Sequence, residues 1–168
     1  MAGRDILKNI NCFVDGRGFA GQVTEFNPPK ITLKVEDFRA GGMDASIPIT
    51  MGMEKLEASF QLAAYDKDVL ASIGFAEGSQ IPLVLRGALE SFDGKVTPVV
   101  HTMRGKITEI DPGSHKPGEL ASLTVTFAPT YYKLEHGSTV VHEIDVENMI
   151  RTINGVDALV EIRKALGI

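Results

Sequence analysis

The sequence lacks several features on which whole classes of function depend. Its 168 residues include no tryptophan and a single cysteine, Cys12, so an intramolecular disulfide is excluded and the chain fits a reducing cytoplasm. No apolar run approaches the roughly 20 residues that a membrane-spanning helix needs. The first eight residues place charges where a signal peptide needs an apolar stretch. We therefore expect neither an export signal nor a membrane anchor.

A cluster of positive charge is also missing. The formal net charge is −5, and the lysines and arginines lie singly along the chain rather than in a stripe. Nucleic-acid binding depends on clustered cations that displace the counterions of the phosphates, so the charge pattern disfavours a nucleic-acid-binding protein. With 43% hydrophobic and 23% charged residues, the chain has the composition of an ordinary globular protein, and its length suits one domain.

Reactive side chains are scarce. The sequence has four histidines: His101, His115, His136 and His142. Neither their spacing nor their distance from Cys12 matches the pattern of zinc ligands. Structural or solvent-exposed histidines are the better interpretation, because a functional histidine needs a charged or metal partner. We expect no catalytic residues and no metal site.

One glycine-rich segment, residues 16–21, matches the dinucleotide-binding pattern G-x-G-x-x-G. That pattern requires a following helix, because the pyrophosphate binds at the N-terminus of the helix. Residues 22–26 instead alternate like a strand and lead into Pro28-Pro29. The glycines therefore indicate a hairpin turn, and we expect no cofactor-binding residues and no cofactor.

Most of the chain is predicted to be β-strand. Alternation of apolar and polar residues indicates half-buried strands in three segments: 31–36, 56–62 and 121–128. A high content of Val, Ile, Thr and Tyr predicts four more: 81–90, 95–110, 130–135 and 139–146. The hairpin-type turn signals are Asp15-Gly16, Asp93-Gly94 and His136-Gly137. The pattern predicts a mainly β protein of one domain, spanning residues 1–168.

A short internal helix is predicted after Asp66, which can cap it. Val69, Leu70 and Ile73 share one apolar face of this helix, and Gly74 marks its end.

A second helix is predicted at the C-terminus, from Val156 to Leu166. Asp157 in its first turn, and Arg163 and Lys164 in its last, favour the helix dipole. A helix of about eleven residues is marginal in water by itself, so its apolar stripe must dock onto a sheet of its own or of a neighbouring subunit. The stripe consists of Val156, Leu159, Val160 and Leu166.

Residues 40–54 do not fit a compact domain. Four residues, Gly41, Gly42, Pro48 and Gly52, interrupt regular structure there, yet methionines and isoleucines are frequent. A long loop without regular structure is usually functional or disordered, and its apolar content argues against disorder. We therefore expect an extended arm that is buried against another chain. The residues expected to make contacts between subunits are Arg39, Gly41, Gly42, Met43, Asp44, Ile47, Ile49, Met51 and Met53.

Three segments carry a family resemblance over essentially the whole chain. They are Arg39-Ala40-Gly41-Gly42-Met43-Asp44, Tyr131-Tyr132-Lys133-Leu134 and Ile153-Asn154-Gly155-Val156-Asp157. In this order and at these spacings they resemble the major tail tube protein of contractile-tailed phages, which also builds the tube of R-type, pyocin-like bacteriocins. None of the three segments has the residue types of an active site, so the resemblance indicates assembly rather than catalysis, and the protein is not expected to be an enzyme.

The resemblance implies a fold of two packed antiparallel sheets, sandwich- or barrel-like, with a helix alongside. Six copies would form a ring in which the sheets join into a continuous β-barrel. Stacked rings would form the inner tube, which conducts the genome during ejection or, in a bacteriocin, pierces the target envelope. Residues 40–54 would be the arm that reaches the adjacent subunit or ring.

The resemblance also implies partners and a location. The partners are other copies of the chain, the tail sheath protein, the baseplate and tail terminator proteins, and the tape measure protein in the lumen. DNA would pass through without specific binding. The protein would be made in the cytoplasm of the host bacterium and would end in the virion tail or the bacteriocin particle.

Two other functions stay open at this point. A related protein of type VI secretion-like tubes also forms hexameric rings but carries effectors, and the motif Arg39–Asp44 favours the tail protein over it. The remote alternative is an enzyme or a small ligand-binding β-domain, for which the sequence supplies no site.

Overall fold

The computed structural model describes residues 3–63, 65–71 and 78–168, and in these ranges the chain is mainly β, as the sequence predicts. Neither of the helices in these ranges has the length and apolarity that crossing a membrane requires. The elements in chain order are β1 (Ile6–Val14), β2 (Arg17–Gly18), β3 (Val23–Asn27), β4 (Leu33–Phe38), β5 (Ile47–Met53), β6 (Ala58–Leu62), α1 (Lys67–Ala71), β7 (Ile81–Glu90), β8 (Val96–Asp111), β9 (Leu123–His136), β10 (Thr139–Asp145), β11 (Ile150–Ile153), β12 (Val156–Asp157) and α2 (Val160–Leu166).

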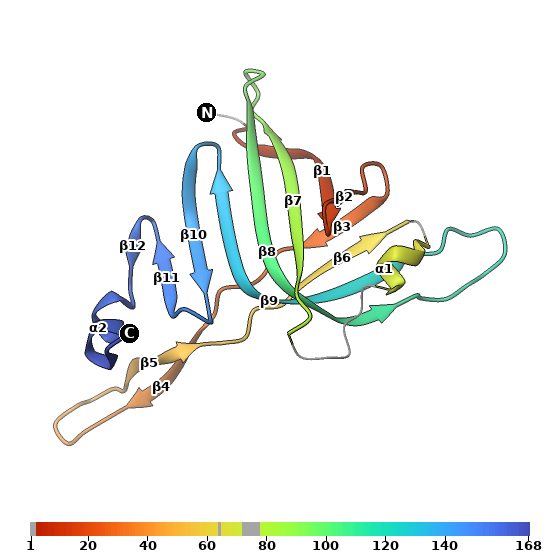
Figure 1. Cartoon of the computed structure of the whole chain (residues 1–168). Coiled ribbons are helices and arrows are strands. Elements are labelled where there is room, and N and C mark those ends of the chain that lie inside the picture. Colours follow the sequence, from red (N-terminus) through yellow and green to blue (C-terminus); the bar gives the residue numbers. More distant parts are fainter. Residues whose placement is uncertain (1–2, 64, 72–77) are drawn as a thin grey trace.

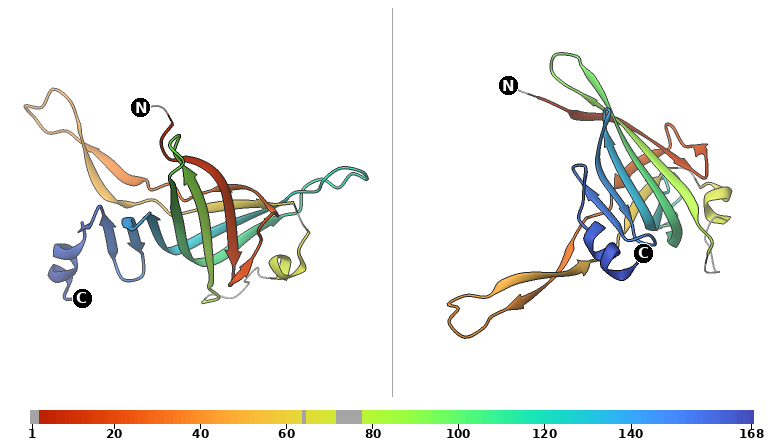
Figure 2. Two further views of the ribbon diagram at one scale, coloured as in Figure 1. Left: turned by 90° about the horizontal axis from the view of Figure 1, so that it is seen from above. Right: turned by 60° about the vertical axis from the view of Figure 1, so that its left-hand side comes forward.

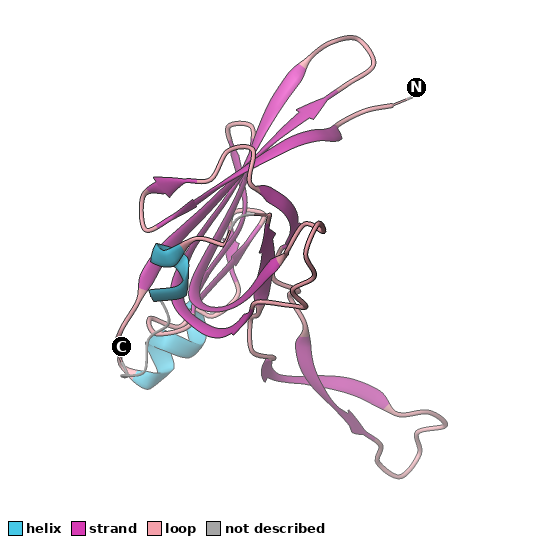
Figure 3. Cartoon of the chain, turned by 90° about the vertical axis from the view of Figure 1, so that its right-hand side faces the viewer, coloured by secondary structure: helices cyan, strands magenta, loops and turns pink. Residues whose placement is uncertain are grey.

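Ten of these strands form one antiparallel sheet that folds over on itself (Figures 1 and 3). The long strand β9 belongs to both halves, because residues 131–136 pair with β10 and residues 123–127 pair with β6. β8 runs beside β9 through both halves. One layer therefore contains β1, β7 and β10, and the other contains β3 and β6. The two packed layers implied by the resemblance are the halves of one bent sheet.

The bend lies where Gly105 of β8 faces Pro129 of β9. The pairing register shifts at this point, and Pro129 has no N–H to donate to the ladder. A side chain at Gly105 would collide with the carbonyl oxygen of Ala128 and with Cα of Pro129. Glycine is required here because the two backbones approach each other too closely for any Cβ atom.

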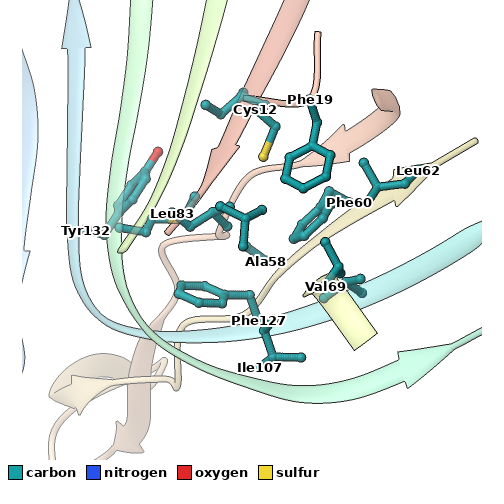
Figure 4. Packing of buried hydrophobic residues seen from close by; sticks show 14 of the residues in the cluster. Cys12, Phe19, Ala58, Phe60, Leu62, Val69, Leu83, Ile107, Phe127 and Tyr132 are labelled. Atoms are coloured by element: carbon teal, nitrogen blue, oxygen red, sulfur yellow. The ribbon is translucent and has the colours of Figure 1, made fainter. Parts of the chain in front are cut away.

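The core fills the space between the two layers (Figure 4). In β6, Ala58, Phe60 and Leu62 are buried while the residues between them are half-buried, which confirms the predicted alternation. Leu123, Val125 and Phe127 of β9 are buried in the same way. The other elements contribute Cys12, Val14, Phe19, Leu56, Val69, Leu83, Leu85, Met103, Ile107, Tyr132 and Ile144.

The predicted hairpin turns are confirmed. Asp15-Gly16 joins β1 to β2, and Asp93-Gly94 lies between β7 and β8. His136 is the last residue of β9, and Gly137 begins the turn to β10. The glycines of these turns have φ angles of 79°, 83° and 62°, in the region that glycine adopts without strain. The glycine-rich segment 16–21 leads into strand β3, so its glycines serve the turn rather than a phosphate-binding helix.

The predicted cap of the internal helix is also confirmed. The Asp66 Oδ1 atom accepts hydrogen bonds from the N–H groups of Asp68 and Val69 at 2.9 and 3.2 Å, which satisfies donors that the first turn of a helix leaves unpaired. Val69 is buried in the core. Ile73 and Gly74, predicted to continue and end this helix, lie outside the described residues.

The predicted C-terminal helix is wrong at its start. Val156 and Asp157 form β12, which pairs with β11 across a turn at Asn154 and Gly155, where φ is 51° and 78°. The physical reason is local, because Asn-Gly is among the sequences that most favour a two-residue hairpin turn. Helix α2 begins at Val160 and ends, as predicted, at Leu166, and Gly167 caps it in a left-handed conformation with φ 77°.

Candidate assembly surfaces

β4 and β5 form a separate two-stranded sheet that projects from the body of the subunit (Figures 1 and 2). We call residues 33–53 the arm. The predicted arm is therefore present, but it starts at Leu33 rather than Ala40, and residues 47–53 are a strand rather than a loop. The motif Arg39–Asp44 forms the tip, where the Arg39 Nε–H group donates a hydrogen bond to the Met43 carbonyl oxygen at 3.1 Å.

One face of the arm carries an apolar stripe that is open to solvent. Cross-strand pairing places Phe38 beside Ile47 and Glu36 beside Ile49, and alternation along β5 adds Met51 to the same face. The exposed fractions of the four apolar side chains lie between 42% and 55%. We call this set the arm stripe: Phe38, Ile47, Ile49 and Met51.

A β-bulge separates the arm stripe from the base of the arm. Val35 pairs with Thr50 but Leu33 pairs with Met53, so β5 has one more residue than β4 across this interval. Gly52 lies in the interval with φ 115°. Met53 consequently turns to the opposite face and packs, half-buried, against the core. Of the predicted contact residues, Met53 is thus the one that the structure places against its own subunit.

The alternation at residues 31–36 predicts a half-buried strand, and for the single chain this is wrong. β4 is exposed at all of its positions, including Leu33, Val35 and Phe38. The residues of β4 were also missing from the predicted contact residues, although their alternation leads directly into the Gly41-Gly42 tip. A two-stranded hairpin is at best marginally stable in water. β4 therefore has the sequence pattern of a half-buried strand but no cover from its own subunit.

A groove of about 890 Å³ opens beside the base of the arm. Its walls come from segments far apart in the sequence: the end of β5, the β8–β9 bend, the end of β10, β11 and α2. Ile144, Ile150, Leu159 and Ile162 give it an apolar lining. We call this feature the groove. No signal in the sequence indicated it, because its walls combine residues 144–162 with three segments far from them in the sequence, at residues 52–56, 78–80 and 105–130.

Two of the three carboxylates that line the groove, Asp145 and Glu147, have hydrogen-bond partners within the subunit, and Glu54 is the third. Asp145 Oδ2 accepts a hydrogen bond from Asn148 Nδ2 at 2.7 Å, and Glu147 Oε1 accepts one from Gln80 Nε2 at 2.9 Å. Arg151 also lines the groove. The groove therefore combines an apolar lining with charged groups of both signs, of which Asp145 and Glu147 are satisfied within the subunit.

Helix α2 is held in place by polar contacts rather than by its apolar side. Arg163 Nη2 lies 2.6 Å from Asp157 Oδ2, and Arg163 Nη1 donates a hydrogen bond to the Met149 carbonyl oxygen at 2.7 Å. The hydrogen bond from Arg163 lowers the pKa of the Asp157 carboxyl. The helix has no buried residue, and Ile162 and Leu166 are 49% and 61% exposed. The predicted apolar stripe is therefore not docked on its own sheet.

The layer that contains β1, β7 and β10 has an open edge at each end, and β3, which pairs with β6 alone among the described residues, is an edge of the other layer. β1 pairs with β7 along its whole length, but on its other side β2 pairs with Phe13 and Val14 alone. At the far end, β12 pairs with Thr152 and Ile153 of β11. Unpaired backbone N–H and C=O groups along such edges favour pairing with another chain.

The two adjacent tyrosines, Tyr131 and Tyr132, point to opposite faces of β9, because successive side chains of a strand alternate. Tyr132 lies in the core with its hydroxyl 2.9 Å from His101 Nδ1, and burial raises the pKa of Tyr132 to about 12 and lowers the pKa of His101. Tyr131 lies on the outer face, where the Arg104 guanidinium is 5.3 Å from its ring centre and its hydroxyl donates a hydrogen bond to Glu143. Both tyrosines have structural partners within the subunit.

The groups that could support chemistry are dispersed. Cys12 is fully buried, and burial raises the pKa of its thiol to about 12. His136 lies 3.9 Å from Asp5, and the His115 ring packs edge-on against Tyr65. Within the described ranges, no group of three or more His, Cys, Asp and Glu side chains is placed to hold a metal ion.

Comparison with known proteins identifies the family. A sequence model described as phage tail tube protein FII matches residues 4–167. The tail tube protein of Escherichia phage P2 is 32% identical over 166 residues, which cover 96% of both chains. The major tail tube protein of Serratia phage KSP20 is 31% identical over 152 residues, or 89% of this chain and 87% of that protein. A chain in the cryo-EM structure of the sheath–tube complex of an extracellular contractile injection system, PVC, in its extended state shares the fold with a TM-score of 0.58 at 10% identity, covering 76% of this chain and 88% of that chain. The chain therefore belongs to the phage tail tube protein FII family.

Proposed function

We propose that this tail tube protein is the structural subunit of the inner tube of a contractile phage tail. Six copies form a ring in which their sheets join into one β-barrel, and the rings stack into a conduit through which the genome is ejected. The role is structural and requires no catalytic group or cofactor. The single observation that carries the proposal is the exposed apolar arm, which one chain leaves without cover.

The open edges of the sheet support ring closure. When β1 of one copy lies beside β11 and β12 of the next, the edge groups of both chains become paired. A barrel closed in this way has no edges left, which removes the aggregation hazard of an open sheet. Pairing with β7 from Ile6 to Val14 holds β1 in an extended conformation. The other edge of β1 is therefore available to pair with a strand of a neighbouring copy.

The arm supports contacts between subunits. Its nine predicted contact residues divide into a tip, Arg39–Asp44, a strand, Ile47–Met51, and the half-buried Met53. Covering the exposed part of the arm stripe removes apolar surface from water, which is the main favourable term in most protein association. A contact between two different surfaces of the same chain can be repeated from copy to copy. It gives a ring when the rotation from one copy to the next closes on itself, and an open stack when it does not.

The outer face of β8 and β9 supports passage of DNA without specific binding. Tyr131, Lys133 and Glu135 lie on this face, and the Lys133 Nζ atom is 3.0 Å from Glu135 Oε1. Arg104 is likewise engaged, by the ring of Tyr131. Cations held by carboxylates and rings, in a chain of net charge −5, leave little to hold phosphates. We assign this face to the lumen of the tube, where the tape measure protein also lies before ejection.

The remaining partners follow from this role. The sheath protein would surround the tube, and the baseplate and tail terminator proteins would meet its two ends. The sheath–tube complex that contains the structural relative supports a sheath partner. The protein would be made in the cytoplasm of the bacterial host and would function in the virion tail.

Electron microscopy of the purified protein tests the proposal. We expect tubes whose end-on views have sixfold symmetry. The matched control is Ile49→Asp, which changes an exposed residue of the arm stripe and should leave a folded subunit that forms no tubes. Wild-type protein that stays as single subunits under all conditions would contradict the proposal. Loose rings that never stack would instead favour a secretion-type ring protein.

A further inference from the structure

We propose that the groove is the docking site for the arm stripe of a second copy of this chain. The inference depends on the proposed tube function and adds the surface that receives the arm. It links two features that the subunit leaves unsatisfied, an apolar projection without cover and an apolar groove without an occupant.

The arm of the same subunit cannot fill the groove. Gly52 and Met53, at the base of the arm, form part of the groove wall. From Met53 to Ile47 the strand extends about 20 Å away from that wall, at about 3.3 Å per residue. The arm and α2 diverge from each other in the view from above (Figure 2). Folding the arm stripe back into its own groove would break the pairing of β4 with β5, so the occupant comes from another copy.

Both sides of the contact need cover for the same physical reason. The arm is a two-stranded hairpin and α2 is a helix of seven residues, and each is marginal in water without tertiary packing. Two apolar side chains at this end of the chain line the groove: Leu159, the N-cap residue of α2, is half-buried, and Ile162 of α2 is 49% exposed. One contact between copies would bury the arm stripe and this side of α2 together.

The charges are complementary as well. Glu36 is the cross-strand partner of Ile49, so its carboxylate lies on the same face as the arm stripe. Arg151 lines the groove, where Asp145 and Glu147 are already bound by Asn148 and Gln80. Docking of the arm stripe therefore brings the Glu36 carboxylate into a lining that contains the Arg151 guanidinium and in which two of the three carboxylates are already hydrogen-bonded.

The donor and acceptor surfaces differ, which sets the symmetry of the contact. Each copy offers one arm and one groove, so each gives one contact and receives one. Such a head-to-tail contact propagates around a ring or from ring to ring, whereas a two-fold contact would stop at a dimer. The groove is thus the surface that allows the arm to build a tube.

Cross-linking between introduced cysteines tests the contact directly. Ile47→Cys, on the arm stripe, is combined with Ile162→Cys, in the groove, and assembled tubes are treated with a short bis-maleimide. Native Cys12 can stay, because it is fully buried and burial raises its pKa to about 12. The control combines Ile47→Cys with Leu120→Cys, which is 92% exposed in the loop between β8 and β9 and outside the groove lining.

We expect a ladder of covalent oligomers from the groove pair and none from the control pair. Tubes that form normally while the two pairs cross-link equally, or while neither does, would overturn the inference but leave the proposed function intact. Absence of tubes from the wild-type protein would instead contradict the proposed function.

A second pair of variants gives an independent readout. Ile162→Asp should abolish tubes while the subunit stays folded, because this side chain is 49% exposed, whereas Ile168→Asp, 73% exposed and outside the groove, should leave tubes intact. Mixing Ile162→Asp with Ile49→Asp should give one-to-one dimers, because the intact arm of the first fits the intact groove of the second. Normal tubes from Ile162→Asp alone would overturn the inference.

Discussion

Replacing three residues of the arm stripe by serine, Ile47→Ser, Ile49→Ser and Met51→Ser, should prevent assembly and leave the subunit folded. The three side chains are 49%, 42% and 55% exposed in the single chain. Complete burial of such a side chain contributes about 1.5–3 kcal/mol. Cover of the exposed half therefore contributes about 1 kcal/mol for each residue, or about 3 kcal/mol for each contact between copies.

That loss corresponds to a contact about 100-fold weaker, since about 1.4 kcal/mol is a factor of ten. The concentration above which tubes form should rise by a similar factor. Pelleting of tubes by centrifugation across a concentration series measures it, and thermal unfolding monitored by circular dichroism checks the subunit. The unfolding midpoint should change little, because the replaced side chains are largely exposed in the subunit.

The control replaces an apolar side chain that is exposed elsewhere, Leu120→Ser, which is 92% exposed in the loop between β8 and β9. It should leave the assembly concentration unchanged. The reasoning would be refuted if the triple variant formed tubes at the wild-type concentration. A triple variant that no longer folds would place the arm stripe in the subunit core, which would also refute it.

Three further predictions concern the body of the subunit and its charge. Gly105→Ala should lower the free energy of unfolding by about 2–3 kcal/mol, because the new Cβ collides with the Ala128 carbonyl oxygen, whereas Gly41→Ala, with nothing within 4 Å, should be neutral in denaturant unfolding. The free energy of unfolding should fall as the pH drops below 6.5, because burial lowers the pKa of His101 and the unfolded chain therefore binds the proton first. His101→Gln should weaken this pH dependence of stability, and an unchanged pH dependence would contradict the role given to His101. Mobility-shift assays at low salt should detect no complex with DNA at micromolar protein, and tight, salt-sensitive binding would contradict the assignment of the lumen.

The strands of the core could be predicted, because the side chains that alternate as apolar residues in the sequence are the ones that their own subunit buries. In β6, alternate side chains point into the core and those between them are half-buried, so the alternation correctly predicts that Phe60 and Leu62 are buried. β4 has a similar alternation, yet Leu33 and Val35 are exposed. Periodicity reports which residues share a face but not which chain covers that face. The sequence therefore predicts a strand at β4 but does not predict that its own subunit leaves it uncovered.

The error at the C-terminus has a different origin. Asp157 was expected in the first turn of a helix, but the Asn154-Gly155 turn brings it into β12, from which it binds Arg163. The hairpin signal was present in the sequence, and it outweighs the charge pattern because a two-residue turn fixes its neighbours as paired strands. The groove could not be predicted from local sequence patterns, because residues as far apart in the sequence as Gly52 and Ile162 form its walls.

A cryo-EM reconstruction of the assembled tube tests the central claim most directly, because it locates every arm relative to every groove. We predict six copies in each ring, with β1 of one copy beside β11 and β12 of the next, and each arm stripe seated in the groove of another copy. A tube in which the arms extend free into solvent, or fold back onto their own subunits, would contradict the account.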